Sequence, residues 1–73
     1  MEYLVDARGL RCPLPLLRAR QALAGLARED SLVVLATDRE APIDLAALAA
    51  DAGRAFAQSS EDGVWRLELA PEE

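Results

Sequence analysis

The chain has 73 residues, of which 52% are hydrophobic and 29% are charged, and its formal net charge is −5. A chain of this length buries only about 60% of the surface that its unfolded form exposes, so we expect a single domain over residues 1–73. The acidic balance argues against direct binding of nucleic acid, because that affinity comes largely from basic side chains that neutralise phosphates.

The sequence contains no continuous apolar run long enough to span a bilayer, and its first residues do not follow the pattern of a signal peptide. Cys12 is the only cysteine and cannot form an internal disulfide, whereas small secreted domains usually need several bridges. We therefore expect a free thiol, a cytoplasmic location and no association with a membrane.

The charges are unevenly distributed along the chain. Residues 1–28 contain five arginines and two acids, whereas residues 29–73 contain three arginines and eleven acids. Cys12 lies in the basic part.

The predicted elements begin with a strand at residues 3–6, which ends in a turn at residues 7–9. Residues 13–27 are predicted to form a helix, because apolar side chains recur on one face at about 100° per residue. The residues on that face are Leu16, Ala19, Leu23, Leu26 and Ala27. This apolar face should pack on a sheet.

A central strand is predicted at residues 31–37, a continuous apolar run with β-branched side chains. A second helix then begins with Pro42, because proline is tolerated in the first turn, and Gly53 caps its end. The predicted buried face of this helix consists of Leu45, Leu48, Ala49 and Ala52.

Two further strands are predicted at residues 54–60 and 64–69, joined by a turn at residues 61–63. In the second of them Trp65, Leu67 and Leu69 alternate with Arg66 and Glu68. The element order is therefore β-α-β-α-β-β. Right-handed crossovers would place both helices on one face of the sheet, which predicts an α/β two-layer sandwich.

Cys12 is predicted to lie at or beside the N-cap of the first helix, because Pro13 and Pro15 determine where that helix begins. There the sulfur would face unpaired N–H groups and the positive end of the helix dipole, which favour a thiolate. With Arg8 and Arg11 close in sequence, we expect a pKa below the usual value for a thiol. The alternative is that Cys12 is a small buried hydrophobe, as free cysteines usually are.

The residues that are missing restrict the chemistry of this thiol. The chain has no histidine and no second cysteine, which excludes a Cys-His dyad, a Cys/His zinc site and an internal dithiol cycle. We therefore expect no metal and no cofactor. An activated thiolate can still take the terminal sulfur of a persulfide on another protein and give it to a third thiol.

Residues 6–15 (DARGLRCPLP) resemble the CPxP signature of the TusA (SirA-like) sulfur-carrier family, and residues 33–38 (VVLATD) resemble its second strand and the aspartate after it. The resemblance covers nearly the whole chain. It implies a four-stranded mixed sheet, and a Cys12 that carries persulfide sulfur. One departure is that residues 28–31 (REDS) contain no glycine, whereas family members often have one in this turn.

The resemblance also implies the partners: a cysteine desulfurase or rhodanese-like donor, and a downstream protein with an acceptor thiol. Members of the family supply sulfur for tRNA thiolation, for the synthesis of sulfur-containing cofactors or for sulfur oxidation. A different hypothesis is a non-catalytic regulatory or interaction module that binds through the basic first helix.

Several other residues are candidates for supporting or docking roles. Arg11, Pro13 and Pro15 would support the thiol, and the candidates for partner docking are Arg8, Leu14, Leu17 and Arg18. Asp38 is expected mainly as a turn or cap residue, with a role in orienting the loop near the thiol as the alternative. Asp44 and Asp51 are predicted to be solvated positions of the second helix.

Overall fold

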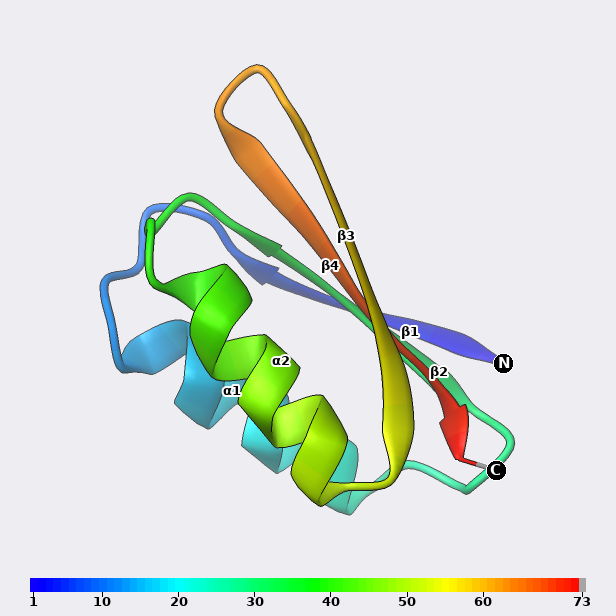
Figure 1. Cartoon of the computed structure of the whole chain (residues 1–73). Coiled ribbons are helices and arrows are strands. Elements are labelled where there is room, and N and C mark those ends of the chain that lie inside the picture. The colour runs from blue at the N-terminus through cyan, green and yellow to red at the C-terminus, as the bar shows by residue number, and fades with distance from the viewer. Residues whose placement is uncertain (73) are drawn as a thin grey trace.

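The computed structural model describes residues 1–72, so Glu73, the last residue of the predicted domain, lies outside the described part. The elements are β1 (Glu2–Ala7), α1 (Leu14–Ala24), β2 (Ser31–Ala36), α2 (Ala41–Asp51), β3 (Arg54–Glu61) and β4 (Val64–Glu72). Within residues 1–72 the four strands form a mixed sheet in the order β1-β2-β4-β3, and both helices cover the same face of it (Figure 1). The predicted two-layer α/β sandwich is confirmed.

The pairing of β1 with β2 determines where the connecting loops lie. The two strands are parallel, and their registers run from Glu2 opposite Ser31 to Ala7 opposite Ala36. Because parallel strands end at the same edge of a sheet, the loops that follow β1 and β2 leave side by side, and α1 and α2 begin there (Figure 1). The loop after β1 contains Cys12.

The core lies between the sheet and the two helices. It is built from buried side chains of the sheet and of α2, with a smaller contribution from α1: Ala7, Ala19, Leu32, Val34, Ala36, Ala41, Leu45, Leu48, Ala49, Leu67 and Leu69. Most of the predicted buried face of α2 is confirmed, although Ala52 is only half-buried. Each helix has 11 residues, and no helix within residues 1–72 is long and apolar enough to cross a membrane.

Helix α1 ends at Ala24, so the prediction that it continues to residue 27 is wrong. Gly25 is a poor helix residue, because it loses much backbone freedom and has no side chain to pack. In addition, the amide of Ala27 donates to Oδ2 of Asp30 (3.1 Å) and is not available to extend the helix. Leu26 still packs against the core, whereas Ala27 is exposed.

The turn at residues 28–31 is held by side chains. Oδ1 of Asp30 accepts from the amino group of Met1 (3.1 Å), and the buried Arg54 donates to the carbonyl oxygens of Asp30, Ala27 (3.0 Å) and Ala70 (3.1 Å). Arg54 is 7% exposed. These bonds tie the loop before β2 to β3 and β4.

The β3–β4 hairpin projects beyond the part of the sheet that the helices cover (Figure 1). Asp62 and Gly63 connect the strands with positive φ angles of 53° and 79°, as a type I′ turn requires. β4 continues to Glu72, beyond the predicted end at residue 69, because Glu72 pairs with Arg54 on β3.

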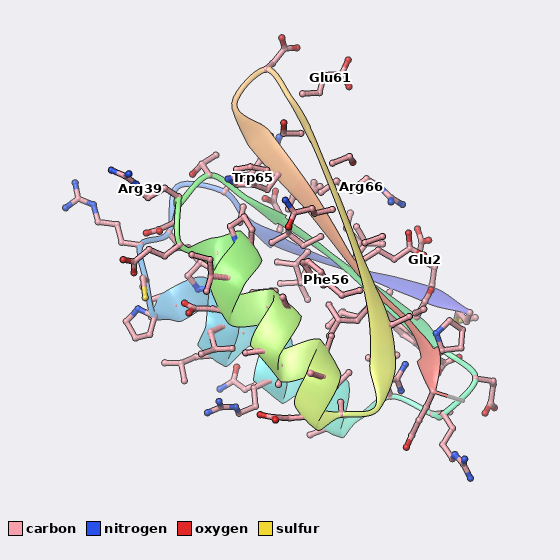
Figure 2. The ribbon with its side chains drawn as sticks, in the orientation of Figure 1. Glu2, Arg39, Phe56, Glu61, Trp65 and Arg66 are labelled. Carbon is pink, nitrogen blue, oxygen red and sulfur yellow. The ribbon has the colours of Figure 1, made fainter. Side chains whose placement is uncertain are left out.

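The predicted alternation along β4 is confirmed in part. Leu67 and Leu69 are fully buried, and Trp65 is half-buried against the core. On the uncovered face Arg66 lies 3.2 Å from Glu68 and 3.7 Å from Glu2 (Figure 2). Arg66 therefore links acidic side chains of β1 and β4 across this face of the sheet.

Candidate functional site

Cys12 lies one residue before Pro13, the N-cap of α1, as predicted, and its thiol is exposed. Within residues 1–72 no side chain caps this helix, and its first amide, that of Leu14, donates to the carbonyl of Arg11 (2.8 Å). The Cys12–Pro13 peptide bond is cis. The alternative reading of Cys12 as a buried hydrophobe is wrong.

The carboxylate of Asp38 holds the Cys12 loop against the start of α2. One oxygen accepts from the amide of Cys12 (2.7 Å) and the other from the amide of Glu40 (2.8 Å). These two hydrogen bonds lower the pKa of Asp38, and the bond from the Glu40 amide has the larger effect. The charges of Arg11 and Arg39 lower it further. Asp38 therefore serves both as a turn residue and as an anchor for the thiol loop.

Asp44 contacts the sulfur directly. The Cys12 thiol donates to Oδ2 of Asp44 across 3.3 Å, and Asp44 is half-buried in the first turn of α2. The prediction that Asp44 is a solvated position is wrong, whereas Asp51, at the other end of α2, is exposed as predicted. Two features of the sequence could have indicated this contact: Asp44 lies in the first turn of its predicted helix, and each helix follows one of two strands that were expected to be parallel.

The pKa of Cys12 is raised from 9.0 to about 11, so the prediction of a lowered value is wrong. The hydrogen bond to Asp44 is the main cause, and the carboxylate of Glu40 adds to it. A carboxylate favours the protonated thiol because it accepts its proton and repels the thiolate.

The two arginines that we expected to favour the thiolate are directed elsewhere. Arg8 donates to both carboxylate oxygens of Asp6 (2.9 and 2.8 Å), which lowers the pKa of Asp6 to about 2. Arg11 acts on Asp38. Sequence proximity to Cys12 therefore did not predict which charges the sulfur meets.

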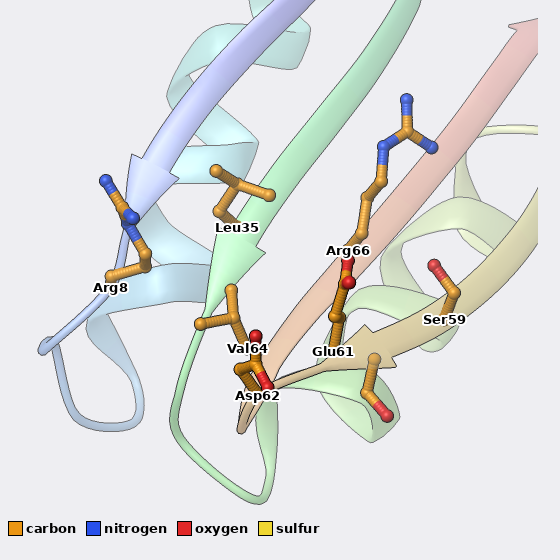
Figure 3. Close-up of a pocket in the computed structure, with 8 residues that line it drawn as sticks. Arg8, Leu35, Ser59, Glu61, Asp62, Val64 and Arg66 are labelled. Carbon is orange, nitrogen blue, oxygen red and sulfur yellow. The ribbon is translucent and has the colours of Figure 1, made fainter.

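Two hollows lie near this end of the sheet. One, of about 630 Å³, is on the uncovered side, where Arg8 and Leu35 face Val64 and Arg66 of the hairpin (Figure 3). The other, of about 370 Å³, is lined by residues of the two adjacent loops: Gly9, Leu10, Arg11, Thr37, Asp38 and Arg39. Arg39 lies at this end of the molecule (Figure 2). The second hollow adjoins the backbone that holds Cys12.

Exposed apolar side chains occupy the starts of both helices. Leu14 is 43% exposed and Leu17 is 41% exposed on α1, and Ile43 on α2, which the sequence analysis missed, is 71% exposed. Pro15 is buried, whereas Pro13 and Arg18 are exposed. We refer to Leu14, Leu17 and Ile43 as the apolar rim.

The fold and the site together define a class of protein: a small two-layer α/β protein that presents one exposed thiol immediately before its first helix. A family model described as Sulfurtransferase TusA matches residues 3–70, and the chain belongs to this family. The predicted family is confirmed.

Individual relatives agree with this assignment. The sulfur carrier protein TusA of Allochromatium vinosum is 41% identical over 59 residues, which cover 81% of this chain and 78% of the relative. A protein of Neisseria meningitidis named as a candidate sulfur carrier is 48% identical over 64 residues, 86% of each chain. The crystal structure of a SirA-like protein from Desulfitobacterium hafniense superposes with a TM-score of 0.87 at 29% identity, covering 97% of this chain and 99% of the other.

Proposed function

We propose that this protein is a sulfur carrier that accepts persulfide sulfur on Cys12 from a donor protein and passes it to an acceptor protein. The observation that carries the proposal is the exposed Cys12 thiol at the start of α1. It is supported by the membership of a family whose members include a protein named as a sulfur carrier.

The transfer needs no chemistry beyond exchange between sulfur atoms. The Cys12 thiolate attacks the terminal sulfur of the donor persulfide, a new S–S bond forms on Cys12, and the donor thiolate leaves and takes up a proton. In the second step an acceptor thiolate attacks the terminal sulfur on Cys12, and Cys12 leaves as the thiolate. The sulfur keeps its oxidation level throughout, so neither step consumes an oxidant.

The loop geometry supports roles for the neighbours of Cys12. Pro13 as the N-cap and the buried Pro15 place the start of α1, and Asp38 binds the amide of Cys12. Arg11 contributes through Asp38, whose carboxylate form it favours. In this proposal these residues keep the sulfur at a defined, exposed position.

The apolar rim and Arg18 form the docking surface of this proposal, because exposed apolar side chains beside a reactive group are typical of protein contacts. The proposed donor is a cysteine desulfurase or a rhodanese-like protein, and the acceptor has a free thiol. The destinations are tRNA thiolation, the synthesis of sulfur-containing cofactors or sulfur oxidation. A cytoplasmic setting would keep Cys12 reduced.

Intact-mass spectrometry tests the proposal. The chain is incubated with a cysteine desulfurase and free cysteine, and we expect one added sulfur atom that a reducing agent removes. Cys12→Ser should acquire none. If the wild-type chain acquires no sulfur from the desulfurase or from inorganic polysulfide, the proposal is wrong.

A further inference from the structure

The thiol of Cys12 faces carboxylates, although it lies in the arginine-rich part of the sequence. Its hydrogen bond to Asp44 joins the loop before α1 to the first turn of α2. Asp44 is half-buried, and its backbone amide donates to the carbonyl of Glu40 (3.1 Å), so its position is set by the helix itself.

The charged groups around the sulfur come from three segments. Asp44 and Glu40, the N-cap of α2, lie at the beginning of that helix, and both favour the protonated thiol. Asp38, in the loop before α2, is already bound to the amides of Cys12 and Glu40, and Arg11 and Arg39 act on it. The sulfur therefore meets two carboxylates, and among residues 1–72 no salt bridge joins either of them to a basic side chain.

We propose that Asp44, assisted by Glu40, keeps the unloaded Cys12 thiol protonated, and that sulfur transfer begins when a cationic group of the donor protein binds these two carboxylates. The inference rests on the proposed function and concerns how that function is controlled. It assigns to the donor a lysine or arginine beside its persulfide, because a positive charge there offsets the repulsion between the two carboxylates and the Cys12 thiolate.

When the cation binds Asp44 and Glu40, the Cys12 proton passes to solvent and the thiolate attacks the terminal sulfur of the donor persulfide. The donor S–S bond breaks, its thiolate leaves and recovers a proton from solvent. The same carboxylates disfavour attack by Cys12 on neutral or anionic disulfides, which bring no cation, so the free carrier is protected from unproductive exchange.

The first test is the pH dependence of alkylation of Cys12 by iodoacetamide. Asp44→Asn removes the charge and should move the profile to lower pH, with alkylation at pH 8 roughly threefold to tenfold faster. Asp51→Asn makes the same charge change at the far, exposed end of α2 and should leave the profile unchanged. A merely structural role for Asp44 would not shift the profile, and an unshifted profile overturns the proposal.

The second test measures selectivity for a positive charge. Cystamine, a cationic disulfide, and 2-hydroxyethyl disulfide, a neutral one, are compared as oxidants of Cys12 at low ionic strength. The ratio of the cystamine rate to the 2-hydroxyethyl disulfide rate should be several-fold higher for the wild-type chain than for Glu40→Gln. It should be lowest for the double variant that carries both Glu40→Gln and Asp44→Asn. Equal ratios in the wild-type chain and the double variant overturn the proposal, and Glu40→Gln provides the test if Asp44→Asn folds poorly.

Both tests are independent of persulfide chemistry, so they separate this inference from the proposed function. If the chain acquires sulfur from polysulfide but shows no preference for cystamine, the sulfur carrier stands and the control by carboxylates is wrong. If the preference is found but no sulfur is acquired, the proposed function is wrong.

Discussion

Cys12 and Asp44 lie 32 positions apart in the sequence, and the thiol of one donates a hydrogen bond to the carboxylate of the other across 3.3 Å. The contact exists because β1 and β2 are parallel neighbours, so that the helices following them begin side by side. The start of the first helix supplies the sulfur, and the start of the second supplies the charge that controls it.

The wild-type thiol should react slowly at neutral pH. Because its pKa is raised from 9.0 to about 11, the alkylation rate should increase about tenfold per pH unit through pH 10 without levelling near pH 9. The same chain unfolded in urea should level off near pH 9, and Cys12→Ser corrects for reaction at other groups. A plateau near pH 9 in the folded chain would contradict the hydrogen bond to Asp44.

The raised pKa also has a consequence for stability. The folded state holds the Cys12 proton more tightly than the unfolded state does, so the bond to Asp44 stabilises the fold below about pH 9. This contribution is lost as the pH rises towards 11. The unfolding temperature of the wild-type chain should therefore fall more steeply between pH 9 and pH 11 than that of Cys12→Ser. Parallel curves for the two chains would contradict this prediction.

Asp38→Ala should loosen the thiol loop, because the amides of Cys12 and Glu40 both lose their acceptor. We expect faster hydrogen exchange at these two amides and a Tm lower by a few degrees. Asp38→Asn keeps one acceptor oxygen and should show a smaller effect. Unchanged exchange at Cys12 in Asp38→Ala would mean that this carboxylate does not hold the loop.

Leu14→Glu should weaken docking of the sulfur donor without unfolding the chain, because Leu14 is 43% exposed in the apolar rim. The measurement is the rate of sulfur loading at limiting donor concentration, which should fall on the order of tenfold. Leu4→Glu is the matched control, since Leu4 is 62% exposed on β1, away from the rim. A large loss of thermal stability in Leu14→Glu, or equal loss of loading in the control, would contradict the docking role.

Arg54→Met should destabilise the fold by about 2–4 kcal/mol, because the carbonyls of Ala27, Asp30 and Ala70 lose a charged donor in a buried setting. Urea denaturation measures this loss. The free energy of unfolding of Arg54→Lys should lie between those of the wild-type chain and Arg54→Met. One ammonium group cannot reach all three carbonyls with the geometry of a guanidinium. A free energy of unfolding within about 0.5 kcal/mol of wild type would contradict the role of Arg54.

The elements of this fold could be predicted because their signals are local. Apolar periodicity identified both helices and all strands, and Gly53 and the turn before Val64 were read correctly because both need backbone conformations that glycine adopts readily. The end of α1 was missed although its causes are local: Gly25 follows the last helical residue, and the amide of Ala27 donates to the side chain of Asp30 three residues later. Arg54 was missed for a different reason, since its three acceptors belong to segments distant in sequence.

The location of the thiol depends on neighbouring residues in the sequence, whereas the charges around it depend on tertiary contacts. The order of residues places Cys12 before a helix, because Pro13 and Pro15 restrict the backbone within a few positions of it. The carboxylate that faces the sulfur depends on the register of β1 against β2, which brings Asp44 to Cys12, whereas Arg8 pairs locally with Asp6. Electrostatic effects of this kind act through space over a few ångströms, so only the packed tertiary structure decided their sign.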